Sequence, residues 1–128
     1  MCQFIDSTAE AMARIYPDLR PPKPMEPKWC IRARDRLLME NYRRYEKGRS
    51  ECSTWLLSFL GYNGSPAALD REIALCRTDP DCDPTRYFYN IELKRSRVEW
   101  AWKENRQYPI SILTRQPLYA TWGPQICQ

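Results

Sequence analysis

The stretch ECSTWLLSFLGYNGSPAALDREIALC, Glu51 to Cys76, carries the strongest indication of how this chain folds. Two apolar halves flank a short polar connection that contains Asn, two Gly, Ser and Pro. Gly61 is a natural end for the first helix, while Ser65 as N-cap and Pro66 at the first helical position start the second. The stretch therefore predicts two antiparallel helices joined by a tight turn.

Two cysteines in this stretch are equally far from the turn. Cys52 and Cys76 each lie twelve residues from Gly64, so an antiparallel helix pair places them at the same height. Their geometry predicts a Cys52–Cys76 disulfide. A rival pair, Cys76 with Cys82, is equidistant from a second turn. We prefer the first pairing because a longer closed loop removes more entropy from the unfolded chain. The remaining cysteines, Cys2, Cys30 and Cys127, stay unassigned. For Cys2 and Cys127, a reduced thiol is as good an expectation as a disulfide.

A repeat of apolar residues every seven positions begins upstream of the hairpin and continues into its first helix. This stripe consists of Ile31, Leu38, Tyr45, Cys52 and Phe59. Its period predicts one long or gently broken helix over residues 31–60. Gly48, followed by Ser50 as a potential N-cap, leaves open the alternative of two separate helices.

Downstream, Asp83 followed by Pro84 predicts the start of a last long helix that runs to about Gln107. Its expected apolar stripe consists of Phe88, Ile91, Val98 and Trp102. After Pro109 the chain is expected to be extended, with one short strand over residues 110–113.

The N-terminal region is predicted to hold a short helix from Ala9 to Tyr16, followed by a proline-rich extended arm from Pro17 to Trp29. The arm is interpreted equally well as a spacer or as a segment laid along a neighbouring subunit. The overall prediction is a mainly α fold: a helical hairpin plus a third long helix, with extended Pro-rich N- and C-terminal arms. Residues 1–29 form the first arm with its short helix, 30–108 the helical body and 109–128 the second arm.

Catalytic chemistry is not predicted. The chain of 128 residues has no histidine, which removes the commonest general base and metal ligand. The carboxylate pairs, Asp70 with Glu72 and Glu99 with Glu104, are interpreted as solvated charges on helix faces. We therefore assign no catalytic, cofactor-binding or metal-binding residue.

The alternation Asp79, Asp81, Asp83 resembles the start of a calcium loop, but it lacks the glycine and the glutamate that the loop requires at its sixth and twelfth positions. These aspartates are interpreted as turn and cap residues. Redox chemistry would favour a C-x-x-C pair, which the sequence lacks.

Tryptophans are the expected anchors for protein partners, because buried Trp dominates many interfaces. Trp29, Trp100 and Trp122 are the candidates, and Trp100 lies off the apolar stripe of its predicted helix. No apolar run approaches the length of a membrane span, and the first ten residues show no presequence pattern. Contact of lipid head groups with the basic side chains of the N-terminal arm stays open: Arg20, Lys23 and Lys28.

The cysteine-bearing hairpin with Cys52, Cys76 and Cys82, together with WAWKENRQYP at Trp100 to Pro109, resembles the supernumerary subunits of mitochondrial respiratory-chain complexes. It is similar in particular to the CHCH type, whose helix hairpins are stapled by disulfides in the intermembrane space. The resemblance covers about the central half of the chain. It implies a non-catalytic role at the periphery of the inner membrane, with the intermembrane-space side favoured.

The expected function is thus that of an accessory, structural subunit of a large mitochondrial inner-membrane complex, a respiratory-chain complex or ATP synthase. Its partners would be other protein subunits, reached through the extended arms. The alternative is an RNA-contacting peripheral subunit of an organellar ribosome, through basic and aromatic segments such as KRSRVEWAWK, Lys94 to Lys103. Nucleic acid is the less favoured partner, because helical periodicity places Trp102 in the core, with Trp100 as the exception. A small secreted disulfide protein is a third, weaker alternative.

Overall fold

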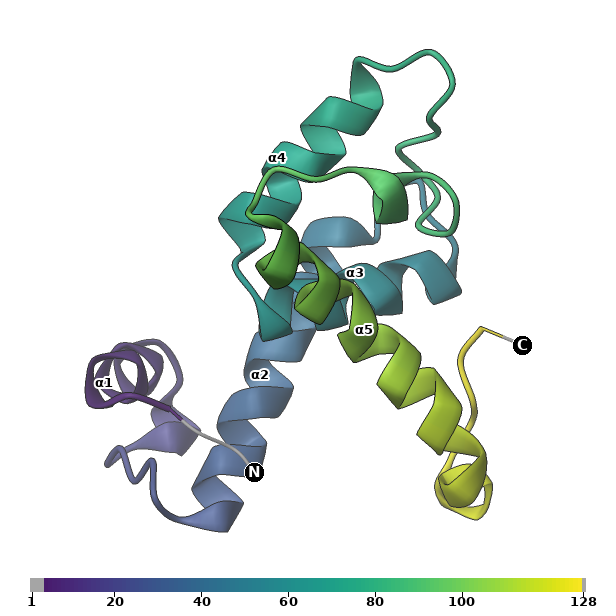
Figure 1. Cartoon of the computed structure of the whole chain (residues 1–128). Helices are drawn as coiled ribbons and strands as arrows, with labels where there is room; N and C mark the ends of the chain where they lie inside the picture. The colour runs from purple at the N-terminus through teal and green to yellow at the C-terminus, as the bar shows by residue number, and fades with distance from the viewer. Residues whose placement is uncertain (1–3, 128) are drawn as a thin grey trace. The chain divides into compact units, whose positions relative to one another are not determined.

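The computed structural model describes residues 4–127, which are mainly helical, as predicted, and contain no strand. Figure 1 shows the helices, whose bounds are α1 Asp6–Ile15, α2 Pro27–Tyr45, α3 Glu51–Asn63, α4 Pro66–Arg77 and α5 Glu99–Arg115. Short 3-10 turns occur at Pro17–Leu19, Ile91–Leu93 and Gln116–Trp122. No helix in the described part of the chain is both long and apolar enough to cross a membrane.

The chain divides into two compact units, Met1–Glu40 and Asn41–Gln128, and the boundary lies within α2. The first unit has its own small core, formed by Ala9, Met12, Leu19, Trp29, Cys30 and Ala33. Trp29 is buried there, and its indole Nε1 donates to the Leu19 carbonyl oxygen at 2.7 Å. The predicted proline-rich arm is therefore shorter than expected, because α2 already begins at Pro27.

Two of the basic residues proposed for lipid contact have partners inside the first unit. The Arg20 guanidinium donates to the carbonyl oxygens of Ala13 and Arg14, at the end of α1, at 2.6 and 2.7 Å. Lys23 lies 3.6 Å from the carboxylate of Glu26.

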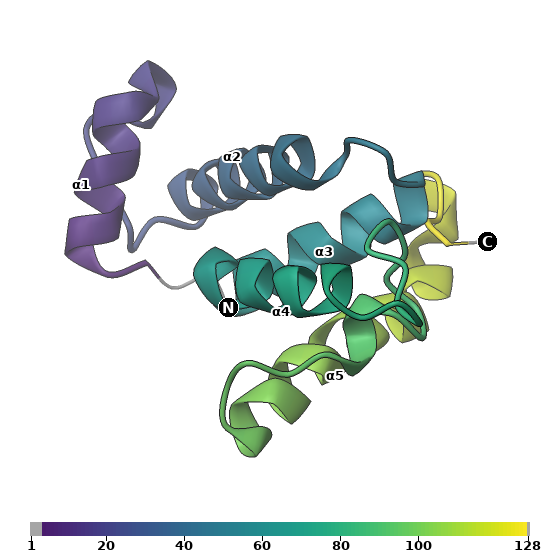
Figure 2. The same ribbon diagram turned by 90° about the horizontal axis from the view of Figure 1, so that it is seen from above.

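The second unit is built around α3, which packs against both α4 and α5. Figures 1 and 2 both show α3 beside these two helices. The core consists of Tyr45, Leu56, Leu57, Leu60, Leu69, Ile73, Cys76, Tyr87 and Ile91. It is thus formed by apolar stripes on α3 and α4 and closed by the segment that follows α4.

The predicted helix over residues 31–60 is two helices, α2 and α3. Gly48 between them has a φ of +75°, a left-handed conformation that glycine adopts at little cost. The hydroxyl of Ser50 then accepts from the Ser53 backbone N–H at 3.2 Å and caps α3. The expectation of one long helix was wrong here, because local breaking and capping residues outweigh a continuous apolar stripe.

The start of α4 agrees with the sequence prediction, whereas α3 continues to Asn63 instead of ending at Gly61. Ser65 caps α4 by accepting from the Ala67 N–H at 3.2 Å, with Pro66 at the first helical position. A Cβ at Gly64 would lie 2.8 Å from Nη1 of Arg97 and 3.0 Å from Nδ2 of Asn105, so any larger residue would displace these side chains.

The predicted helix from Pro84 to Gln107 was wrong. Residues 78–98 form turns and one 3-10 turn, and α5 starts only at Glu99. The Arg49 guanidinium donates to the Pro84 carbonyl oxygen at 2.8 and 3.1 Å, so a long-range side chain takes an acceptor that a helix would use. Tyr89 adopts a left-handed conformation with φ of 62°, which interrupts any helix.

The predicted extended chain after residue 109 was also wrong. Helix α5 continues through Pro109 to Arg115, and residues 110–113 form no strand. Proline inside a helix removes one backbone hydrogen bond. Pro109 is buried, and this burial offsets part of that loss.

Candidate protein-interaction surface

Three exposed apolar side chains lie on the segment that leads into α5 and on the first turn of that helix. Leu93 is 61% exposed, Val98 60% and Trp100 71%. Val98 is the N-cap residue of α5, and its carbonyl oxygen accepts from the Trp102 N–H at 3.0 Å. We call these three residues the Trp100 surface. Its tryptophan is of the residue type that is most enriched in interface hot spots.

The neighbouring Trp102 points into the protein. Its indole Nε1 donates to the Lys94 carbonyl oxygen at 2.8 Å, and the Arg106 guanidinium carbon lies 5.7 Å from the centre of its ring. These contacts fasten the first turn of α5 to the preceding loop. Trp100 is therefore presented from a fixed element.

A buried carboxylate lies beneath this loop. The side chain of Glu72 on α4 is fully buried, and Oε1 accepts from Nη2 of Arg97 at 2.7 Å and from Nη2 of Arg106 at 3.0 Å. Oε2 accepts from Nε of Arg97 and from the Ser96 N–H, both at 3.0 Å. Charge-assisted bonds of this kind are stronger than neutral ones. Glu72 thus joins α4, the loop and α5, and we call it with Arg97 and Arg106 the Glu72 cluster.

Besides its bond to Glu72, Arg106 donates hydrogen bonds to the backbone of the loop. Its guanidinium donates to the carbonyl oxygens of Glu92 at 3.0 Å, Lys94 at 2.8 Å and Ile91 at 3.3 Å. The Ile91 oxygen also accepts from the Lys94 N–H at 3.0 Å, and the Lys94 oxygen accepts from the Trp102 indole, so Arg106 adds to the bonds of a segment that has no strand or long helix. Arg106 therefore stabilises the irregular course of the loop.

The pKa of Glu72 reflects two opposing influences. Burial would raise it, but the hydrogen bonds from Arg97, the positive charge of Arg106 and the Ser96 N–H outweigh burial and hold the pKa below its ordinary value of 4.5. The carboxylate is consequently ionised at neutral pH, as its two cationic partners require.

We expect acid to weaken the Glu72 cluster. Because the folded-state pKa lies below the unfolded value, the stabilisation is fully present above about pH 4.5 and is lost as pH falls through the folded pKa. The carboxyl carbon resonance of Glu72 should titrate below pH 4.5, and the free energy of unfolding should fall over the same range. A titration midpoint above 4.5 would contradict this account.

The interpretation of Glu72 as a solvated charge was wrong. The sequence places Glu72 on a core-facing helix face, three residues after Leu69 and four before Cys76, but it does not show which cations pair with it. By contrast, Glu99 is exposed and lies 3.3 Å from Lys103, as a surface pair.

The candidate anchors separate into two classes. Trp100 and Trp122 are 71% and 86% exposed. Trp29 belongs to the core of the first unit, where its ring meets Phe4 edge to face at 5.7 Å. Trp29, one of the three expected anchors, is therefore a packing residue of this core.

The three disulfide candidates are all disulfide-bonded, but not as preferred. Cys76 pairs with Cys82, the rival pairing, with Cα atoms 5.2 Å apart. Cys52 pairs with Cys127, with Cα atoms 4.7 Å apart. The preference for Cys52–Cys76 failed because loop entropy measures how much a bond stabilises, not which thiols the fold brings together. Cys30 is also disulfide-bonded, whereas Cys2 lies outside the described residues.

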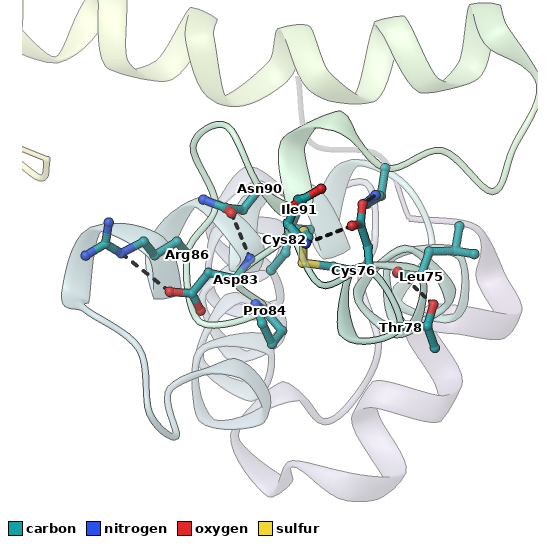
Figure 3. The surroundings of a disulfide bond; sticks show 12 residues. Leu75, Cys76, Thr78, Cys82, Asp83, Pro84, Arg86, Asn90 and Ile91 are labelled. Carbon is teal, nitrogen blue, oxygen red and sulfur yellow. Dashed lines mark hydrogen bonds and ion pairs between the residues drawn. A yellow bond between two sulfur atoms is a disulfide. The ribbon is translucent and has the colours of Figure 1, made fainter.

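Figure 3 shows the Cys76–Cys82 disulfide with Asp83 and Asn90 near it. Asp83 accepts from the Thr85 N–H at 2.9 Å, and its own N–H donates to the Asn90 side-chain oxygen at 2.8 Å. Asp79 similarly accepts from the Asp81 N–H at 2.9 Å and also pairs with Lys94. These carboxylates act as turn residues, and between residues 4 and 127 no cluster of three potential ligands could hold a metal ion.

Comparisons with protein-family models, curated proteins and solved structures return no match to this chain. Its function is therefore argued from its own residues and their geometry.

Proposed function

We propose that this protein is a non-catalytic accessory subunit that stabilises a larger assembly by docking onto a neighbouring protein. The observation that carries the proposal is Trp100, a largely exposed tryptophan on the first turn of a helix that the Glu72 cluster holds in place. Interface hot spots are enriched in Trp, and a side chain presented from a rigid element loses little conformational entropy on binding.

The surroundings of Trp100 support a protein partner over other ligands. Charged side chains of both signs lie near it on the same helix. Two are acidic, Glu99 and Glu104, and one is basic, Lys103. A central aromatic residue with a polar, charged rim is the usual anatomy of a protein interface. Mixed charges give no continuous positive surface for a phosphate backbone.

For the assembly itself we propose a mitochondrial inner-membrane complex, a respiratory-chain complex or ATP synthase, with the chain at the intermembrane-space side. This part of the proposal rests on the resemblance of the sequence to CHCH-type subunits. The structure differs from that type in one respect, because neither Cys52–Cys127 nor Cys76–Cys82 joins α3 to α4. The disulfides Cys52–Cys127 and Cys76–Cys82 support an oxidising compartment, because disulfides are rarely kept in reducing ones.

The test is co-migration on native gels. Mitochondrial membranes are solubilised in mild detergent, and the chain is located by mass spectrometry. We expect it to migrate with one large inner-membrane complex. Migration with ribosomal particles would favour the RNA-contacting alternative, and migration near its own mass, 15.3 kDa, would reject the accessory-subunit proposal.

We expect Trp100→Ala to release the chain from its assembly without unfolding it. Because Trp100 is exposed, its loss should change the free energy of unfolding by no more than about 0.5 kcal/mol. Loss of a hot-spot Trp should nevertheless weaken binding by about 2 kcal/mol, roughly thirtyfold. Co-migration and chemical denaturation of the same variant measure the two effects.

The matched control is Trp122→Ala, which removes an equally large and exposed side chain from the same unit. This variant should still co-migrate in detergent. Equal loss of co-migration by both variants would show that docking does not depend on the Trp100 surface in particular.

A further inference from the structure

A second exposed apolar segment lies at the opposite end of α5. Residues 116–127 follow the helix, and every residue from Pro117 to Pro124 is exposed. Leu118 is 77% exposed, Tyr119 62% and Trp122 86%. We call residues 116–127 the C-terminal loop.

This exposure is not that of a frayed end, because both ends of the loop are fastened. The Gln116 side chain accepts from the Ile126 N–H at 2.9 Å and donates to the Ile126 carbonyl oxygen at 2.8 Å. The adjacent Cys127 is joined to Cys52 on α3. The loop is thus closed on itself and tied to the body, so Leu118, Tyr119 and Trp122 are kept in solvent.

The C-terminal part of the chain, from Gln107 onward, carries very few charged side chains. Between Gln107 and Cys127 the only side chain charged at neutral pH is that of Arg115, although 28% of the whole chain is charged. No acidic side chain follows Glu104. The Trp100 surface differs in this respect, since acidic and basic side chains flank it.

We propose that the C-terminal loop inserts into the interfacial layer of a lipid bilayer. Trp and Tyr favour the head-group level, where their rings are amphipathic, and Leu118 reaches further toward the acyl chains. Acidic side chains would oppose such insertion, and this region has none. Arg115 at the base of the loop supplies a positive charge for anionic head groups.

A bilayer explains these features better than a protein partner does. A protein interface usually surrounds its apolar centre with a polar, partly charged rim, and none of the eight consecutive exposed residues from Pro117 to Pro124 is charged. The short 3-10 turn of the loop limits the depth of insertion, because backbone groups without partners are excluded from the hydrocarbon core. The contact is therefore interfacial.

This inference rests on the proposed function only in placing the chain beside a membrane. The two fail separately, since assembly is measured by co-migration in detergent and depends on Trp100, whereas lipid binding is measured on the purified chain and depends on the C-terminal loop.

The experiment is co-sedimentation of the purified, oxidised full chain with vesicles of phosphatidylcholine alone, or with about one fifth phosphatidylglycerol. We expect binding to both vesicles, and tighter binding to the anionic ones. The variant Leu118→Ser/Tyr119→Ser/Trp122→Ser should bind at least about tenfold more weakly, because three interfacial side chains are lost.

The matched control is Leu93→Ser/Val98→Ser/Trp100→Ser, which removes three exposed apolar side chains from the other end of α5 and should bind vesicles as the wild type does. Quenching by lipids brominated on the acyl chain provides a direct readout. Trp122→Tyr should keep vesicle binding and lose most of the quenching.

Three results would overturn the proposal. They are absence of wild-type binding to either vesicle, equal weakening by both triple variants, and a loop variant that binds vesicles normally but has changed its oligomeric state in solution. The last would assign the loop to contact with another copy of the protein.

Discussion

Glu72→Ala is expected to lower the free energy of unfolding by about 3 to 5 kcal/mol, because it leaves two largely buried guanidinium groups without their counter-ion. The Arg97 and Arg106 side chains are only 12% and 7% exposed, so water cannot replace the lost carboxylate. Urea denaturation followed by circular dichroism measures the change.

Two further variants separate the causes. Glu72→Gln keeps the volume of the side chain but not its charge, and should recover only a minor part of the loss. Glu99→Ala removes an exposed carboxylate paired with Lys103 and should change stability by no more than about 0.5 kcal/mol. A cost below about 1 kcal/mol for Glu72→Ala would mean that the cluster does not hold the loop.

The second large effect concerns the disulfides. The Cys52–Cys127 bond joins residues 75 positions apart, whereas Cys76–Cys82 spans only 6. On the chain-entropy model, the first stabilises the fold by about 4 kcal/mol and the second by about 2 kcal/mol. Removing Cys52 and Cys127 together by alanine should therefore cost about twice as much as removing Cys76 and Cys82.

Peptide mapping without reduction checks the pairing on which this prediction depends. A linked peptide containing Cys52 and Cys127 should be found, beside one containing Cys76 and Cys82. A Cys52–Cys76 link would contradict the structure. Removal of Cys52–Cys127 should also free the C-terminal loop and reduce vesicle binding, without disturbing Trp100.

The candidate surface could be anticipated only in part. Trp100 was identified from its position off the predicted apolar stripe, and it is exposed, but Val98, a member of that stripe, is exposed as well. Glu72 was missed, although its helix face contained the signal, because a glutamate among core positions is identified as buried only once its cationic partners are known. Those partners, Arg97 and Arg106, lie 25 and 34 residues away in sequence.

The region after α4 shows why local signals can mislead. Asp83 followed by Pro84 is a sound helix start by itself, and the structure uses Asp83 as a cap, but of a turn. Side chains from distant elements decide the outcome, because Arg49 and Arg106 bond the carbonyl groups that a helix would need. No window of neighbouring residues contains that information.

By itself, the sequence determined what depends on neighbours along the chain: the mainly helical class and the capped start of α4. It offered Gly48 and Ser50 as a possible break, but the long apolar stripe was given more weight than these two residues. The tertiary structure alone decided which cysteines pair, where α5 begins and that Glu72 is buried. The physical reason is the distance along the sequence over which each interaction acts. Capping and helix-breaking residues act within one turn of helix. Disulfides, buried ion pairs and hydrogen bonds from distant side chains to backbone carbonyl groups require residues that meet only after the helices have packed.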